Sequence, residues 1–326
     1  MGETHSDMVE TQMNNAVRTS LLLASILLPC ITAGPVSAKT IYVDNQIGSD
    51  RFDGISSKPT GRGAGPVETI RRATELAGSG GRIVVANTGQ PYYENVVLFG
   101  HKNSGTRREP FRIEGQGATL DGTVAIPDSA WESVGNSVFR YRPTLLSHQM
   151  LYNEGRPLPQ VFAKKGSLVR PRLEPGQWCY HDGTIYFRVE GNRLPETYRL
   201  RCAGHGAGLL LYRVDHVEIS GLTIQGFQLD GIQAADAVSK ISLVGLNLRG
   251  NGRSGISVQG ASRITASQCL VGNNGRAQVR VDGYCKANLD DCDVLDNTAA
   301  PFVVSRGKLF VDGKPYPSVS TNETGE

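Results

Sequence analysis

Apolar and polar positions alternate through the C-terminal third of the chain, and the same short block recurs there at a fixed spacing. Apolar residues lie two apart, as in Val217-x-Ile219 and Ile241-x-Leu243, which is the spacing of a β-strand. Glycine, asparagine or aspartate interrupts each unit, so no unit has room for a helix of ten or more residues. The rows that keep the period of 24, 23 and 23 residues are Leu222, Leu246, Cys269 and Cys292; Val217, Ile241, Ile264 and Ala287; and Ile232, Ile256, Val279 and Phe302.

A repeat of this length predicts a solenoid. One unit of strand-forming residues closes a single small coil, and stacked coils place equivalent side chains about 4.8 Å apart in parallel ladders. We expect the row that begins at Leu222 to face inward. The pattern over residues 208–313 resembles the right-handed parallel β-helix proteins of the pectate lyase and polygalacturonase superfamily. The resemblance implies an all-β fold, a right-handed parallel β-helix.

Residues 39–123 are expected to form an N-terminal cap and the first coils. A strand at 41–43 precedes a turn-rich loop, and residues 66–77 read as an amphipathic helix that Gly78 stops. This order of parts is similar to the start of many secreted bacterial β-helix proteins. The helix would close the open end of the stack, where exposed strand edges would otherwise recruit another chain.

Residues 124–201 break the rhythm and hold both tryptophans. Short strands separated by proline and charge predict an inserted antiparallel β subdomain. Similar insertions wall one side of the cleft in β-helix glycosidases and lyases, which makes Trp178 and Tyr180 candidates for substrate binding. The alternative is a packing flap without substrate contact. The repeats then fill residues 202–313, and residues 314–326 read as a polar tail.

The N-terminus predicts an export signal. Arg18 precedes an apolar run at 21–28, and the small residues before position 39 place a cleavage site after Ala38. The run is too short to span a bilayer, Met13 is an alternative start to Met1, and we expect a secreted or periplasmic monomer. A net charge of +3 without a basic run gives no indication of nucleic-acid binding.

Cysteine and carboxylate spacing offers few metal sites. Five cysteines remain after cleavage, an odd number that does not suggest a disulfide framework. Cys269 and Cys292 share the inward row, either as buried apolar side chains or as a disulfide between coils. Asp44, Asp50 and Asp53 are candidate calcium ligands, although turns of this composition also form without metal. No cofactor is predicted beyond this possible calcium ion.

The candidate catalytic residues come directly before the repeated Gly-Ile-type strands. In the polygalacturonase family, catalytic residues line this face of successive coils, and the matching positions here are His205, Asp230, Arg253 and Arg276. Leu229-Asp230-Gly231 resembles one polygalacturonase segment, but the row lacks a second carboxylate. Hydrolysis of that kind needs two. A lyase instead needs a base and a cation that neutralises a uronate carboxylate, which Arg253 and Arg276 could supply.

We therefore expect an exported, carbohydrate-active protein, a lyase or a glycosidase acting on a polysaccharide that can be acidic. His205 or Asp230 would orient substrate or move a proton, and Lys102 is a further candidate for substrate binding, or for the base if its loop folds over the cleft. Loss of either arginine should weaken binding and leave thermal stability nearly unchanged. The alternative is a polysaccharide-binding or cell-surface β-helix without catalysis.

Overall fold

A computed structural model describes residues 38–164 and 166–317. The expected export signal, except Ala38, lies outside this range, as does the end of the polar tail. Within the described residues, no helix is long and apolar enough to cross a membrane.

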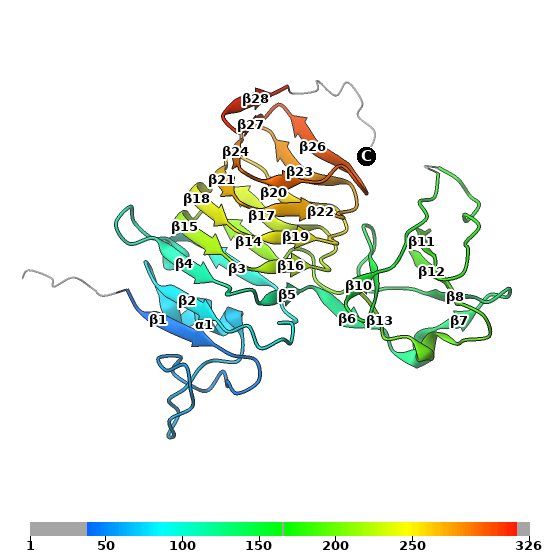
Figure 1. Ribbon diagram of the computed structural model, residues 1–326, viewed down its shortest axis with the longest axis horizontal. Coiled ribbons are helices and arrows are strands. Elements are labelled where there is room, and N and C mark those ends of the chain that lie inside the picture. The colour runs from blue at the N-terminus through cyan, green and yellow to red at the C-terminus, as the bar shows by residue number, and fades with distance from the viewer. Residues whose placement is uncertain (1–37, 165, 318–326) are drawn as a thin grey trace, which may run out of the picture. The chain divides into compact units, whose positions relative to one another are not determined.

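The described chain winds into a parallel β-solenoid with three sheets, here called A, B and C, along its length (Figure 1). After β14, each coil contributes one strand to A, one to B and one to C in turn. Sheet A contains β1 (Thr40–Val43), β2 (Arg82–Val85), β4 (Phe111–Glu114), β15 (Asp215–Ser220), β18 (Ser239–Val244), β21 (Arg263–Ser267), β24 (Lys286–Asp290), β27 (Lys308–Val311) and β28 (Lys314–Tyr316). Sheet B contains β5 (Thr119–Asp121), β16 (Thr223–Gln225), β19 (Asn247–Arg249), β22 (Leu270–Gly272) and β25 (Asp293–Val294). Sheet C contains β3 (Val96–Phe99), β14 (Leu209–Tyr212), β17 (Asp230–Asp236), β20 (Ser254–Val258), β23 (Ala277–Asp282) and β26 (Ala300–Ser305).

The predicted ladders have the register that the period requires. Val217 pairs with Ile241, Ile241 with Ile264 and Ile264 with Ala287 in sheet A. The row that begins at Ile232 pairs in the same way through sheet C. The inward row is also confirmed, because Leu222, Leu246 and Cys269 are buried in one core cluster and Cys292 packs against it. Burial of these rows in consecutive coils is what holds the stack together.

The chain end differs from the expectation. Lys314–Tyr316 form β28, which pairs antiparallel with β27 as a hairpin. These three residues were expected in the polar tail. Phe302 and Tyr316 rings meet edge to face at 4.7 Å, which brings the hairpin onto the last coil.

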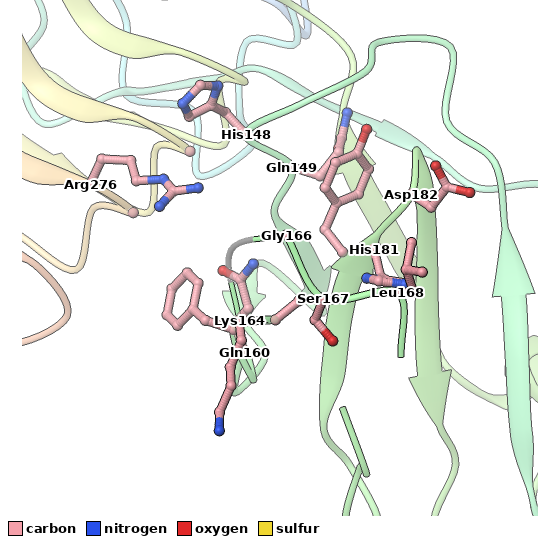
Figure 2. Close-up of a pocket in the computed structure, with 15 residues that line it drawn as sticks. His148, Gln149, Gln160, Lys164, Gly166, Ser167, Leu168, His181, Asp182 and Arg276 are labelled. Carbon is pink, nitrogen blue, oxygen red and sulfur yellow. The ribbon is translucent and has the colours of Figure 1, made fainter. Parts of the chain in front are cut away.

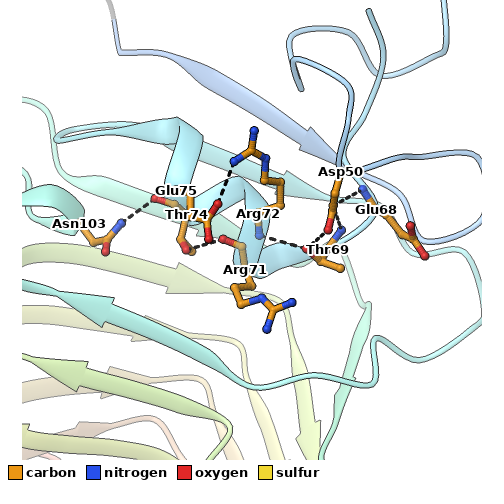
Figure 3. A network of polar contacts seen from close by, with 8 residues as sticks. All are labelled: Asp50, Glu68, Thr69, Arg71, Arg72, Thr74, Glu75 and Asn103. Atoms are coloured by element: carbon orange, nitrogen blue, oxygen red, sulfur yellow. Dashed lines mark hydrogen bonds and ion pairs between the residues drawn. The ribbon is translucent and has the colours of Figure 1, made fainter. Parts of the chain in front are cut away.

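The cap helix α1 (Ile70–Ala77) packs Ile70, Ala73 and Ala77 into the solenoid core. It begins at Ile70 and not at Pro66, because Val67 forms a β-bridge with Val43 and the Thr69 hydroxyl caps the helix by accepting from the Arg72 amide at 3.1 Å. Asp50 fixes this start by accepting hydrogen bonds from the Glu68 and Thr69 amides (Figure 3). Gly78, with φ of 70°, ends the helix as predicted.

The insertion lies between β5 and β14, where other coils cross from sheet B to sheet C by a short turn. Its strands form two antiparallel sheets, as the turn signals predicted. One contains β6 (Thr123–Ala125), β9 (Leu151–Asn153), β10 (Arg156–Pro157) and β13 (Leu200–Ala203); the other contains β7 (Glu132–Ser133), β8 (Val138–Tyr141), β11 (Trp178–His181) and β12 (Thr184–Arg188). Short 3₁₀ helices are η1 (Gly100–Asn103), η2 (Asp128–Ala130) and η3 (Pro195–Thr197). The Tyr152 hydroxyl donates to the Gly250 carbonyl at 2.6 Å, which ties the insertion to the solenoid.

Candidate functional site

The turns from sheet B to sheet C stack on one another through main-chain hydrogen bonds. The Arg253 amide donates to the Leu229 carbonyl at 2.8 Å, and the Arg276 amide donates to the Arg253 carbonyl at 2.9 Å. The two arginines therefore occupy equivalent positions on adjacent coils. Asp230 is not equivalent to these arginines. It pairs with Ser254 in sheet C, so its position in the coil is one residue after that of Arg253.

Asp230 and Arg253 form a buried ion pair. The Asp230 carboxylate is fully buried and accepts from Arg253 Nε at 3.0 Å, from Arg253 Nη2 at 2.5 Å and from the Ser254 hydroxyl at 2.5 Å. A carboxylate held in this way cannot reach a substrate. Our expectation that Asp230 orients substrate or moves a proton was therefore wrong. Loss of Arg253 is therefore now expected to lower stability, in contrast to the expectation from the sequence, because removing one partner of a buried pair leaves the other charge unpaired.

Arg276 has a different environment although its backbone position is the same. Arg253 reaches back one coil to Asp230, and the residue that corresponds to Asp230 on the next coil is Ser254. Arg276 thus lacks a neighbouring carboxylate there. Its side chain is exposed, and no salt bridge joins it to a described residue. Figure 2 shows the guanidinium directed into a cleft.

The cleft has a volume of about 500 Å³ and lies between the insertion and the turns at Gly252 and Gly275. The solenoid contributes Arg276, and the insertion contributes the opposite wall (Figure 2). The charged, polar and aromatic side chains that line it include His148, Phe162, Lys164, Tyr180, His181 and Asp182.

His148 is one of the cleft residues that sequence reasoning missed, together with Phe162, Lys164, His181 and Asp182. Its segment is anchored because Gln228 Nε2 donates to the carbonyls of Leu146 and Ser147. The Ser147 amide also donates to the Tyr180 hydroxyl at 2.7 Å. Ser147 and His148 both adopt left-handed backbone conformations, with φ of 70° and 41°. His148 belongs to the aperiodic insertion, so no repeat could have indicated it.

The electrostatics around His148 favour the neutral imidazole. Burial lowers the pKa of His148, and the nearby Arg276 and Arg253 guanidinium groups lower it further, against the opposing effect of Asp230. One ring nitrogen, Nδ1, lies 3.1 Å from the Ser147 hydroxyl. Gly252 allows the close approach of this segment, because a Cβ atom there would overlap the His148 carbonyl oxygen. A neutral imidazole beside a cation can accept a proton at neutral pH.

The two predicted aromatic contacts have different positions. Tyr180 lines the cleft, half-buried, and its role in substrate binding stays a prediction. Trp178 is fully buried in the core of the insertion, where its indole donates to the Leu158 carbonyl at 3.0 Å. The expectation of a substrate contact by Trp178 was therefore wrong.

His205 and Lys102 do not line this cleft. His205 is half-buried, and burial followed by the charge of Arg71 lowers the pKa of its imidazole. Lys102 is exposed in η1, just after the end of β3, whereas Arg276 precedes the start of β23 in the same parallel sheet. The two cations thus lie at opposite ends of the strands of sheet C, and Lys102 is not the base of this site.

A second cavity of about 470 Å³ continues the cleft along the stack. The two share Gln160, Phe162 and Gly275. None of the described residues that line this second part is charged, and its further walls are Met150, Pro157, Leu158, Pro159, Asn273, Asn274, Asn297 and Thr298. The two cavities are neighbours, one with a charged lining and one with an uncharged lining, and we call the pair the groove.

The aspartates proposed for calcium have other roles. Asp44 accepts from the amides of Gln46 and Ile47, and Asp53 accepts from those of Ile55 and Gly65. Asp50 holds the start of α1. Within residues 38–164 and 166–317, no group of three or more histidine, cysteine or acidic residues could hold a metal ion.

Comparisons with known proteins identify the fold. Residues 201–322 match the family model of the right-handed beta helix region. No curated protein matches the sequence. The chain contains a right-handed parallel β-helix.

Solved structures similar to the chain include XylC in complex with xylose, with a TM-score of 0.44 and 12% identity over 82% of this chain. Pectate lyase Pel9A gives a TM-score of 0.42 and 12% identity over 85% of this chain. The GH136 lacto-N-biosidase from Eubacterium ramulus gives 0.38 and 11% over 83%. The chain spans 65%, 63% and 50% of the lengths of these three proteins, respectively.

Proposed function

We propose that the groove binds an acidic polysaccharide and that the protein cleaves it by β-elimination. The observation that carries this proposal is Arg276, an exposed cation that has Ser254 on the previous coil where Arg253 has Asp230, beside His148 in one cleft. A guanidinium can hold a substrate carboxylate through two parallel charge-assisted hydrogen bonds. The expected export signal agrees with a substrate outside the cell.

The chemistry follows from these two side chains. Arg276 stabilises the negative charge that develops on the uronate carboxylate when the adjacent carbon loses its proton. The neutral His148 imidazole accepts that proton. The electron pair of the broken C–H bond forms a C=C bond, and the C–O bond to the leaving sugar breaks. The leaving oxygen takes a proton from the Tyr180 hydroxyl or from water.

Hydrolysis has weaker support from the same cleft. An inverting or retaining glycosidase requires two carboxyl groups across the scissile bond. Asp182 is the one carboxylate among the described residues that line the cleft. Elimination requires no second carboxylate, so the cleft favours a lyase.

The uncharged half of the groove favours a polymer that is not acidic at every unit. Asn273, Asn274 and Asn297 offer amide groups, and the exposed ring of Phe162 offers an apolar face for a sugar. A chain with an acidic unit at Arg276 and neutral or esterified units beyond it would match both parts. Such a chain would lie along the solenoid axis, because the groove residues Gly252, Gly275 and Asn297 belong to consecutive coils.

The test is incubation of the protein with a panel of uronate polymers and neutral glycans. Ultraviolet absorbance of an unsaturated product and release of reducing ends are measured together. Lyase action gives both signals on an acidic polymer, whereas hydrolysis gives reducing ends alone. Arg276→Ala should abolish most turnover, and Lys102→Ala, which removes an exposed cation in η1, should not. Binding without either signal would support the non-catalytic alternative.

A further inference from the structure

Cys269 and Cys292 occupy equivalent positions on the last two coils of sheet B. Each directly precedes a strand, and the following residues, Leu270 and Asp293, pair in parallel register. The Asp293 amide donates to the Cys269 carbonyl at 2.9 Å. Neighbouring parallel strands lie about 4.8 Å apart, and disulfides join Cα atoms separated by about 4.4–6.8 Å. The backbone spacing therefore permits a bond between the two sulfur atoms.

Both thiols point into the same interior row and meet there. Cys269 Sγ lies 3.3 Å from the Ser267 carbonyl oxygen, and Cys292 Sγ lies 3.5 Å from the Asp290 carbonyl oxygen, so the two side chains have matching orientations. The inward direction agrees with the packing of both residues against one core cluster. Leucines fill this row on the two coils before them, which shows that the position itself does not require sulfur.

The two cysteines differ in access and in acidity. Cys269 is buried, whereas Cys292 is only half-buried because β25 is the last strand of sheet B. A hydrogen bond from Cys269 lowers the pKa of the Cys292 thiol to about 7, against the effect of burial. The lowered pKa favours the thiolate of Cys292, which is the reactive form.

We propose that Cys269 and Cys292 are a redox-sensitive pair that forms a disulfide between the last two coils. With a small disulfide such as oxidised glutathione, the Cys292 thiolate attacks one sulfur and expels one glutathione thiolate. The Cys269 thiol then loses its proton to solvent and attacks Cys292 in the mixed disulfide, which expels the second glutathione thiolate. The protein loses two hydrogens, and two molecules of glutathione are released in reduced form.

The bond would close a loop that contains one complete coil. A disulfide restricts the unfolded chain, and a terminal coil of a solenoid has a neighbour on only one side. The oxidised form should therefore resist unfolding from the C-terminal end. This inference does not depend on the proposed function, because the pair does not line the groove.

The experiment treats the full chain with oxidised glutathione and then measures thiol content, intact mass and disulfide-linked peptides. We expect the loss of two hydrogen masses and two thiols, a linked peptide pair at Cys269 and Cys292, and a melting temperature higher by about 5–10 °C that dithiothreitol reverses. Cys292→Ser should abolish all these changes. The matched control Cys285→Ser, which removes another buried thiol, should retain them.

A glutathione adduct that persists on Cys292, or unchanged thiol content, would overturn the proposal. Linkage of other cysteines would also overturn it. Cys269→Val provides a second variant with an apolar side chain in a row that already accepts leucine. If this variant folds and still loses two thiols, the assigned pair is wrong.

Discussion

The turns at Arg253 and Arg276 have equivalent backbone hydrogen bonds, but their side chains have different roles. Both arginines stack through equivalent main-chain hydrogen bonds on adjacent coils. Arg253 lies 19% exposed over a buried Asp230, whereas Arg276 faces a cleft. The difference arises on the previous coil. Arg253 finds Asp230 there, whereas Arg276 finds Ser254 at the equivalent position. A repeat thus sets where a side chain starts, and its neighbour on the previous coil decides what that side chain does.

The largest effect that tests this contrast is on stability. Arg253→Ala leaves the fully buried Asp230 carboxylate without its cation, and we expect the free energy of unfolding to fall by about 3–5 kcal/mol. Denaturant unfolding measures the loss. The double variant Asp230→Ala/Arg253→Ala should recover part of it, because no unpaired charge remains. A change below about 0.5 kcal/mol for Arg253→Ala would place this arginine in the same class as Arg276.

The next effect concerns His148, which lines the same cleft as Arg276. If the imidazole removes the proton, His148→Gln should lower kcat by about 10²- to 10⁴-fold with little change in melting temperature. His181→Gln, which changes a second histidine of the same cleft, is the matched control. Equal losses in both variants would argue against a specific base.

The pKa of His148 depends on the charge of Arg276. Its pKa lies below the ordinary value of about 6.5, so the neutral form and the activity should persist as the pH falls through 6.5 and disappear at a lower pH. Arg276, Arg253 and Arg280 lower this pKa, and Asp230 raises it. Arg276→Ala should therefore move the acidic limit of the residual activity to higher pH. An unchanged limit would show that another group controls it.

The same shift predicts the direction of a stability change. Below about pH 6.5 the unfolded chain binds a proton at His148 before the folded chain does, so stability falls as the pH decreases through this range. His205 has a lowered pKa and contributes with the same sign. Unfolding of the wild type and His148→Gln across this range measures the contribution, which should be smaller in the variant.

The smallest effect is expected at Lys102. This exposed residue follows the end of β3, whereas the cleft lies at the starts of the strands of sheet C. Lys102→Ala should leave polymer turnover within about twofold and stability within about 0.5 kcal/mol. A large loss of turnover would mean that the substrate extends across sheet C.

The sequence predicted the parts of this protein that obey the period. The ladders at Val217 and Ile232 and the inward row at Leu222 could be predicted in register, because a coil of fixed length leaves no other alignment. The Asp230–Arg253 ion pair could not be predicted in this way. It joins residues on adjacent coils that are not at equivalent positions, since Asp230 is equivalent to Ser254. His148 was missed because the insertion has no repeat, and Trp178 was misassigned because an indole can line a cleft or fill a core.

The most direct test of the account is binding of one acidic oligosaccharide and its neutral methyl ester, measured by calorimetry. A guanidinium–carboxylate contact of about 1.5–3 kcal/mol corresponds to about 10- to 150-fold in affinity. The wild type should prefer the acid by this factor, and Arg276→Ala should bind acid and ester equally, with unchanged melting temperature. Lys102→Ala should retain the preference. Equal binding of acid and ester by the wild type, or a preference that survives in Arg276→Ala, would contradict the assignment of Arg276 to the substrate carboxylate.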